Sequence, residues 1–132
     1  YHIARFDLNE VKSNSKVRKE FHPLSWCWSS QGKQEWRWKG FPEPRPIFNL
    51  KALADNPQSP VVVCEGEAKS IAAGQLLPGY ISTCNSGGSN AAHKAFWEPL
   101  RGRTTLIWPD ADEAGKTWLR TVLKLLTDLG CS

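Results

Sequence analysis

Three valines and a cysteine at residues 61–64 constrain the fold of this chain more than any other feature. A short run that is apolar throughout predicts a strand buried on both faces, as in parallel sheets. The run leads directly into EGEAKSIAAGQLL, in which Ile71, Ala72, Gln75 and Leu76 recur at helical spacing. A strand followed at once by a helix predicts a parallel sheet with right-handed crossover connections.

The strand–turn–helix pattern recurs twice in residues 80–130. YISTC and TTLIW are apolar runs of strand length, and NSGGSN and PDADEAG are the turns that follow them. We expect a short helix at AAHKAFWEPL, capped by Ser89 or Asn90, and a longer one at KTWLRTVLKLLTDLG. The longer segment carries an apolar stripe at steps of three and four, formed by Trp118, Val122, Leu125, Leu126 and Leu129. Residues 61–132 are therefore predicted to be an α/β domain, a parallel sheet with flanking helices.

Residues 1–60 have a different character and are predicted to form a small antiparallel, β-rich subdomain. WCW (26–28) and WRW (36–38) flank a glycine-containing loop, which predicts a hairpin. On each arm both indoles share one face, because side chains alternate along a strand. We expect the four tryptophans to pack in a core against the sheet, because a small hairpin needs an apolar face, and stacking on nucleic-acid bases is the alternative. The three prolines of FPEPRPIF exclude a helix or a central strand there.

The positive charge of the chain lies in its first half. Residues 1–60 hold 10 Lys and Arg against 6 Asp and Glu, whereas residues 61–132 hold 7 of each. A basic region of this kind predicts a polyanionic partner, with an ordinary solvated surface as the alternative.

Cysteine usage and hydropathy exclude several classes of protein. No stretch approaches the roughly 18 apolar residues of a membrane span, so we expect no membrane partner. The four cysteines lack the spacing of zinc ligands. Cys64 and Cys84 lie in apolar runs and are predicted to be buried free thiols, which suits a reducing cytoplasm. The chain begins at Tyr1 and contains no methionine, so we expect a piece of a longer protein.

Acidic residues follow two of the predicted strands. Glu65 comes directly after the first, and Asp110 and Asp112 come after the third. Because parallel strands end at one edge of a sheet, we expect these carboxylates to meet there. Carboxylates held close together raise one another's pKa, and a divalent cation relieves the conflict. Oxygen ligands suit Mg²⁺ or Mn²⁺, whereas the alternative is that Glu65 and Asp110 are acids favoured near helix N-termini by the helix dipole.

Three motifs in this order resemble the Toprim domain. They are VVVCEGE, TCNSGG and LIWPDADEAG, and the resemblance covers residues 61–130. The domain occurs in bacterial-type primases, in topoisomerases, and in certain nucleases and recombination proteins. The form W-P-D-x-D-x-x-G and the basic segment that precedes the core resemble most closely the primases and primase-helicases of phages and plasmids.

The resemblance implies roles for individual residues. Glu65 matches the catalytic glutamate, a candidate acid and base, and Asp110 and Asp112 match the metal-binding aspartates, so that all three are implied in catalysis and in Mg²⁺ or Mn²⁺ binding. Residues expected to shape or support the site are Gly66, Glu67, Lys69, Gly87 and Gly88. Candidate contacts to nucleic acid or nucleotide are Arg18, Lys19, Lys33, Arg37 and Lys39.

The chain departs from the Toprim pattern at two places. Many members carry an acid four positions after the first glutamate, where this chain has Lys69. A cation there is expected to pair with the carboxylates or to contact a phosphate. A further strand usually follows the last helix, and this chain stops at LGCS, where that strand is expected to begin.

The resemblance implies a DNA primase core that synthesises RNA primers on a single-stranded DNA template from ribonucleoside triphosphates. A helicase domain or protein is an expected partner. A nuclease uses the same acids and remains an alternative, as does a nucleic-acid-binding module without catalysis. Strand cleavage of the topoisomerase type is not supported, because neither Tyr1 nor Tyr80 is placed as its nucleophile.

Overall fold

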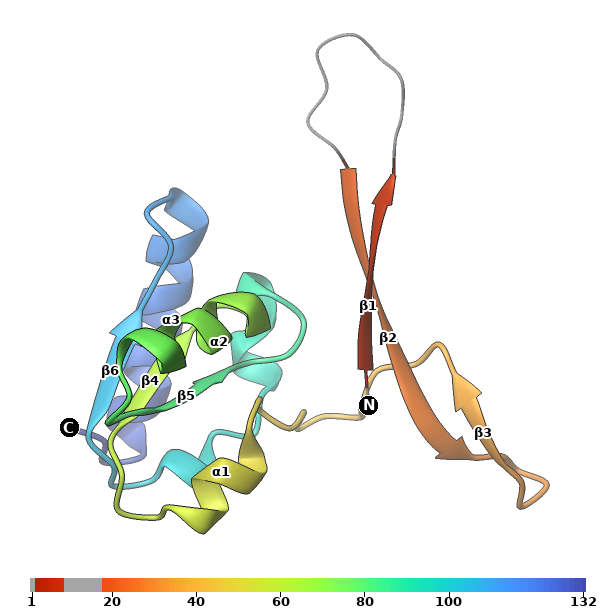
Figure 1. The fold of residues 1–132 in the computed structure, drawn as a ribbon, viewed down its shortest axis with the longest axis horizontal. Coiled ribbons are helices and arrows are strands. Elements are labelled where there is room, and N and C mark those ends of the chain that lie inside the picture. The colour runs from red at the N-terminus through yellow and green to blue at the C-terminus, as the bar shows by residue number, and fades with distance from the viewer. Residues whose placement is uncertain (1, 9–17) are drawn as a thin grey trace, which may run out of the picture. The chain divides into compact units, whose positions relative to one another are not determined.

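The computed structural model describes residues 2–8 and 18–132 (Figure 1). Contacts divide the chain into two compact units, Tyr1–Pro42 and Glu43–Ser132. The boundary lies earlier than the sequence-based boundary after residue 60. Residues 43–60 belong with the parallel sheet, because Ile47 and Leu53 are part of its hydrophobic core.

The first unit is an antiparallel sheet of order β1-β2-β3. Its strands are β1 (His2–Leu8), β2 (Arg18–Trp28) and β3 (Gln34–Arg37). The predicted hairpin is confirmed, with Trp26 opposite Trp36 in the register of β2 and β3. Gly32 allows the turn between them, since its φ of 73° is in the left-handed region that glycine tolerates.

The prediction that the four tryptophans pack as a core is wrong. Trp26 and Trp36 are 50% and 49% exposed, and Trp28 and Trp38 are more exposed still. The reason is architectural, because the described residues of this unit form a single layer of sheet. Its indoles lie on one face and contact neighbouring rings there.

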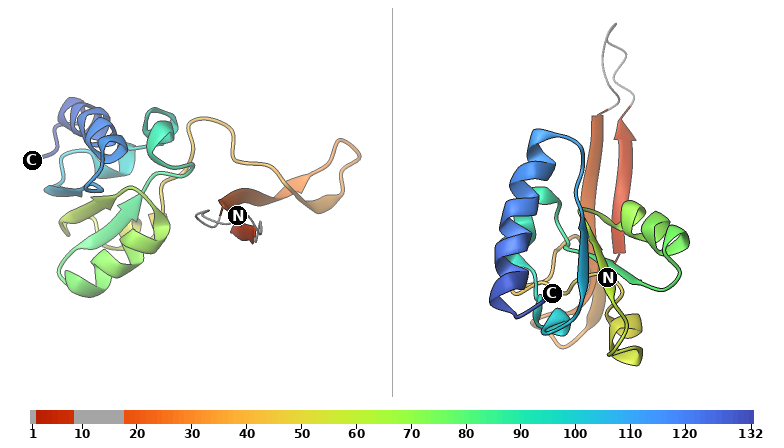
Figure 2. Two further views of the ribbon diagram at one scale, coloured as in Figure 1. Left: turned by 90° about the horizontal axis from the view of Figure 1, so that it is seen from above. Right: turned by 90° about the vertical axis from the view of Figure 1, so that its left-hand side faces the viewer.

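The second unit contains the predicted parallel sheet, of order β5-β4-β6. Its strands are β4 (Val61–Cys64), β5 (Ile81–Cys84) and β6 (Thr105–Trp108). Helices α2 (Glu67–Leu76) and α3 (Glu113–Asp128) cover opposite faces of the sheet (Figure 2). Val61 and Val63 face the α3 side, and Val62 and Cys64 pack with Ala73 of α2. All four residues of β4 are buried, as the apolar run predicts.

The two helices pack differently. On α3, Trp118, Val122 and Leu126 are buried, so the predicted stripe is confirmed. On α2, by contrast, Ile71 and Leu76 are exposed, and the buried residues are Ser70 and Ala73. The predicted helix is confirmed, but Ile71 and Leu76 lie on its exposed side. Small residues are buried instead because the helix lies close to the sheet, and a Cβ on Gly74 would lie 2.8 Å from Ser82 Oγ.

Residues 43–60 contribute to the core of the second unit. Helix α1 (Leu50–Asp55) buries Leu53, and Ile47 is buried beside it. The Phe48 N–H donates to the Cys84 carbonyl at 2.9 Å, and the Thr83 hydroxyl donates to the Phe48 carbonyl at 2.6 Å. These hydrogen bonds hold the backbone at Phe48 alongside β5.

The single helix predicted over residues 91–100 is wrong. Two short 3₁₀ helices, Ser89–Lys94 and Glu98–Leu100, take its place. Ala95 between them is extended and pairs with Arg45, because the Arg45 carbonyl accepts from the Phe96 N–H at 2.7 Å. No side-chain cap is formed by Ser89 or Asn90 at this helix. The expectation of a further strand after the last helix stays a prediction.

Candidate functional site

The two acidic segments meet at the carboxyl edge of the parallel sheet. Cys64 lies opposite Trp108 in the register of β4 and β6, so both strands end at the same level. Glu65 is the first residue after β4, and its Oε1 accepts a hydrogen bond from the Asp110 N–H at 3.3 Å. The side chain of one acidic segment thus contacts the backbone of the other.

Gly115 makes this close approach feasible. A Cβ at that position would lie 2.8 Å from Glu65 Oε1 and 2.3 Å from the Asp110 carbonyl oxygen. No side chain fits at such distances. The first turn of α3 therefore lies directly against the acidic edge only because residue 115 is glycine.

Asp112 caps helix α3. Its Oδ1 accepts a hydrogen bond from the Gly115 N–H at 2.7 Å, and its backbone is extended, as is typical of an N-cap. The carboxylate is held at the same sheet edge as Glu65, and it is already one of the charges that act on the Glu65 carboxyl.

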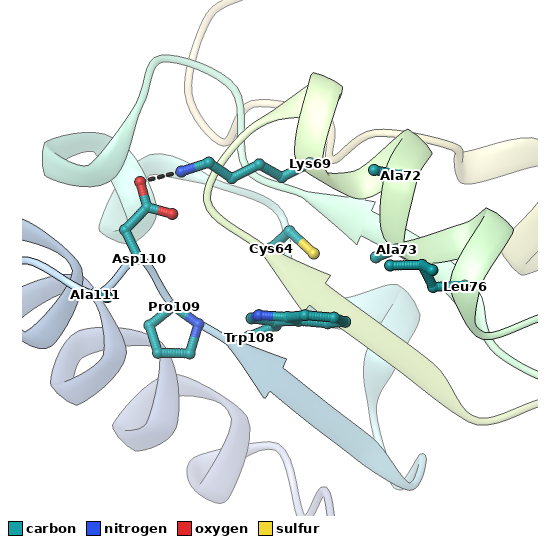
Figure 3. Close-up of a pocket in the computed structure, with 9 residues that line it drawn as sticks. All are labelled: Cys64, Lys69, Ala72, Ala73, Leu76, Trp108, Pro109, Asp110 and Ala111. Carbon is teal, nitrogen blue, oxygen red and sulfur yellow. Dashed lines mark ion pairs between the residues drawn. The ribbon is translucent and has the colours of Figure 1, made fainter.

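The Asp110 carboxylate makes an ion pair with the Lys69 ammonium, which reaches it from the first turns of α2 (Figure 3). Their side chains are 31% and 51% exposed, so water reaches the pair. The expectation that Lys69 pairs with the carboxylates is thus confirmed. Asp110 and Asp112 have different partners, although they stand two residues apart.

A pocket of about 370 Å³ opens beside this ion pair. Lys69 and Asp110 line one part of it, and Trp108 lies against its apolar part (Figure 3). The remaining lining comes from Cys64, Ala72, Ala73, Leu76, Pro109 and Ala111. Charged groups and an apolar surface thus border one hollow at the strand ends.

The electrostatics of Glu65 reflect its neighbours. Burial raises the pKa of its carboxyl above the ordinary value, and the negative charges of Asp110 and Asp112 raise it further. The hydrogen bond from the Asp110 N–H and the charge of Lys69 oppose this rise. The three carboxylates therefore act on one another electrostatically, as expected of acids gathered at one edge.

The donor set suits a hard divalent cation. All three side chains offer carboxylate oxygens, which Mg²⁺ and Mn²⁺ prefer, and a cation would relieve the repulsion that raises the Glu65 pKa. Within residues 2–8 and 18–132, however, no three His, Cys, Asp or Glu side chains are arranged as a ready-made metal site. Two of the carboxylates have other partners, since Asp110 pairs with Lys69 and Asp112 accepts from the Gly115 N–H. Metal binding stays a prediction.

The other predicted site residues surround this edge. Gly66 is the N-cap of α2, and Glu67 is its first residue. Gly87 and Gly88 form a turn after β5, with φ values of 93° and 75° that favour glycine. A Cβ on Gly87 would also lie 2.8 Å from Arg45 Nη1, so the turn packs against the Arg45 side chain.

Sequence reasoning missed Asn85. Its side chain is almost fully buried just after β5. The Asn85 Nδ2 donates to the Gly88 carbonyl at 2.8 Å, and its Oδ1 accepts from Trp118 Nε1 at 2.8 Å. The amide thus fixes the glycine turn to helix α3. A polar residue between a buried strand and a glycine pair was the available signal.

The predicted basic residues of the first unit are dispersed. Arg37 pairs with Glu35 on β3, Lys33 lies in the hairpin turn, and Lys39 follows β3. Alternation along the strands places Arg37, which lies opposite Ser25, on the face away from Trp36. The side chains of Arg18 and Lys19 lie outside the described part of the structure.

Buried free thiols are confirmed for Cys64 and Cys84. Burial raises the pKa of both, most strongly for Cys84, so both are held as inert thiols. Of the helices in residues 2–8 and 18–132, none is long and apolar enough to cross a membrane.

Comparison with family models, with curated proteins and with solved structures finds no match to this chain.

Proposed function

We propose that the chain is the catalytic core of a DNA primase, a nucleotidyltransferase that joins ribonucleotides on a single-stranded DNA template. The observation that carries the proposal is the hydrogen bond from the Asp110 N–H to Glu65, which brings the acids of EGE and D-x-D to one sheet edge. The order β5-β4-β6 supports it, because the ligands of open parallel sheets bind at the carboxyl ends of the strands.

In this proposal Glu65, Asp110 and Asp112 hold Mg²⁺ or Mn²⁺. The bound ion supplies positive charge to the phosphoryl oxygens on which negative charge develops. The three acids come from two segments of the fold. Glu65 follows β4, and the two aspartates lie between β6 and α3. Asp112 would hold its position through the Gly115 N–H, which fixes one carboxylate oxygen and leaves the other for the ligand.

The reaction joins the 3′-oxygen of one ribonucleotide to the α-phosphorus of the next. The bond from that phosphorus to the bridging oxygen breaks, and pyrophosphate leaves. Glu65 is the group proposed to accept the proton of the attacking hydroxyl, because its carboxylate lies at the sheet edge beside the D-x-D segment. Lys69 is proposed to contact the triphosphate, because its ammonium already lies at the edge and pairs with an anion there.

A primer-synthesis assay tests the proposal. The full chain is incubated with end-labelled single-stranded DNA, labelled ribonucleotides and Mg²⁺ or Mn²⁺, beside Asp110→Asn. A matched control is Asp128→Asn, an exposed acid at the other end of α3. We expect short ribonucleotide products from the unaltered chain and from the control, and none from Asp110→Asn. Shortened DNA would instead establish a nuclease, and the absence of both products would indicate a module without catalysis.

A further inference from the structure

The sheet of the first unit carries aromatic side chains on one face. This aromatic face consists of His2, Phe6, His22, Trp26, Trp28, Trp36 and Trp38. All of them have even numbers, and the register sets Trp26 opposite Trp36, so alternation brings them to the same side of β1, β2 and β3. The aromatic face is therefore built from residues of all three strands and of the segment that follows β3.

The rings meet in two groups. In one, the Trp36 ring centroid lies 5.2 Å from that of Trp26 and 5.4 Å from that of His2. In the other, Trp38 lies 6.1 Å from Phe6 and 6.2 Å from His22. The interplanar angles in these four pairs run from 50° to 80°, so the rings meet edge to face or tilted. The rings in each group contact one another, and none of these four pairs of rings stacks in parallel.

These rings are also accessible. Trp38 is 61% exposed, Trp28 is 71% exposed, and Phe6 is 43% exposed. Exposed aromatic rings gathered on one face of a small unit mark a binding site, since isolated exposed apolar residues are ordinary but gathered ones are not. The aromatic face is therefore suited to bind a ligand with flat, apolar surfaces.

Charge identifies the class of ligand. Residues 1–42 hold 8 Lys and Arg against 4 Asp and Glu, a net charge of +4. Residues 43–132 hold 9 of each, so the first unit carries the whole net charge of the chain. A polyanion with exposed flat faces is a single-stranded nucleic acid, whose unpaired bases stack on aromatic side chains while its phosphates contact cations.

We propose that the aromatic face is a stacking platform for the unpaired bases of single-stranded nucleic acid. A hollow of about 440 Å³ among Phe6, Glu20, His22 and Trp38 gives one base a defined place on it. The Glu20 carboxylate is hydrogen bonded to His22 Nε2 at 3.2 Å and borders this hollow. The inference is independent of the chemistry at the acidic edge, and it would hold equally for a primase, a nuclease or a binding module.

The test uses the full chain and end-labelled oligothymidylate of about 12 nucleotides. An abasic oligonucleotide of the same length and charge separates stacking from phosphate binding. We expect oligothymidylate to quench tryptophan fluorescence and to bind at least tenfold more tightly than the abasic strand. Equal affinity for the two strands, or for a duplex of the same sequence, would overturn the proposal.

Matched variants locate the platform. Phe6→Leu is paired with Phe96→Leu, because Phe96 is 41% exposed in the second unit and outside the proposed sites. Trp38→Leu is paired with Trp38→Tyr, which keeps an aromatic ring. We expect Phe6→Leu and Trp38→Leu to weaken oligothymidylate binding about tenfold, with Phe96→Leu unchanged and Trp38→Tyr within about threefold of the parent.

Equal losses in Trp38→Leu and Trp38→Tyr, or none in Trp38→Leu, would contradict stacking at that ring. Absence of oligothymidylate binding by the folded parent chain would likewise overturn the proposal. The Asp110→Asn variant separates this inference from the proposed function. It should bind oligothymidylate like the parent even where primer synthesis is lost.

Discussion

Lys69 forms an ion pair with Asp110 at the carboxyl edge of the parallel sheet. The acid that would hold a metal ion therefore already has a cation beside it. This relationship explains how three carboxylates share one edge without forming a ready-made metal site among the described residues. The ammonium compensates one negative charge, and a divalent ion would have to take its place.

Competition of this kind predicts that removing the Lys69 charge strengthens metal binding. Lys69→Met keeps much of the apolar length of the side chain and leaves Asp110 without its cation. We expect the affinity for Mn²⁺, measured by calorimetry, to rise about fivefold to tenfold, which corresponds to roughly 1 kcal/mol for a partly exposed pair. Lys51→Met is the matched control, because Lys51 pairs with Asp55 on α1. An affinity that is equal in both variants would show that Lys69 does not compete.

Gly115 should tolerate no side chain. In Gly115→Ala the added methyl group would overlap the Asp110 carbonyl and Glu65, which forces α3 away from the sheet edge. We expect the free energy of unfolding, measured with urea, to fall by about 1–3 kcal/mol. Gly79→Ala is the control, because no atom lies within 4 Å of a Cβ at that position. A change in Gly115→Ala no larger than in the control would contradict the close approach.

The buried amide of Asn85 should be coupled to Trp118. Asn85→Ala leaves Trp118 Nε1 buried without its acceptor, and we expect a loss of about 1–3 kcal/mol in the free energy of unfolding. Trp118→Phe in the Asn85→Ala background removes the unsatisfied N–H. The double-mutant cycle should therefore show a coupling energy of about 1 kcal/mol or more. Strictly additive losses would indicate that the hydrogen bond contributes nothing.

The raised pKa of Glu65 predicts a defined dependence of stability on pH. Because its folded-state pKa lies above the unfolded value near 4.5, its contribution is fully present below that pH and is lost as pH rises through the folded pKa. Glu65→Gln keeps an oxygen acceptor for the Asp110 N–H and removes the titration. We therefore expect the variant to gain stability over the parent between pH 4 and pH 7 in urea unfolding.

Glu113→Gln is the control for this pH dependence. Glu113 is exposed in the first turn of α3, where a negative charge favours the helix. Its neutral variant should lose rather than gain stability relative to the parent at pH 7. A pH profile of Glu65→Gln that runs parallel to the profile of the parent would contradict the raised pKa.

The sequence predicts the parallel sheet well because its signal is local. The apolar run at residues 61–64 must be buried on both faces, and the strand order then brings Glu65 and Asp110 to one edge. The pairing of Lys69 with a carboxylate was also within reach of the sequence, since Lys69 lies four residues after Glu65 in the segment that follows the buried strand.

The features that the sequence misjudges depend on packing partners. Whether Trp26 and Trp36 form a core or an open face depends on a second layer, which alternation along a strand does not reveal. Similarly, α2 buries Ser70 and leaves Ile71 exposed because the distance to the sheet selects small residues. The Asn85–Trp118 hydrogen bond joins residues 33 positions apart, so no local sequence pattern predicts it.

The central claim is that the two acidic strand ends form one metal site. Titration of Mn²⁺ into the full chain, followed by the electron paramagnetic resonance signal of the free ion, measures this directly. We predict that the parent binds Mn²⁺ and that Glu65→Gln and Asp110→Asn each weaken binding at least tenfold, while Asp128→Asn does not. Binding that is unchanged in Glu65→Gln and Asp110→Asn, or absent from the folded parent, would contradict the claim.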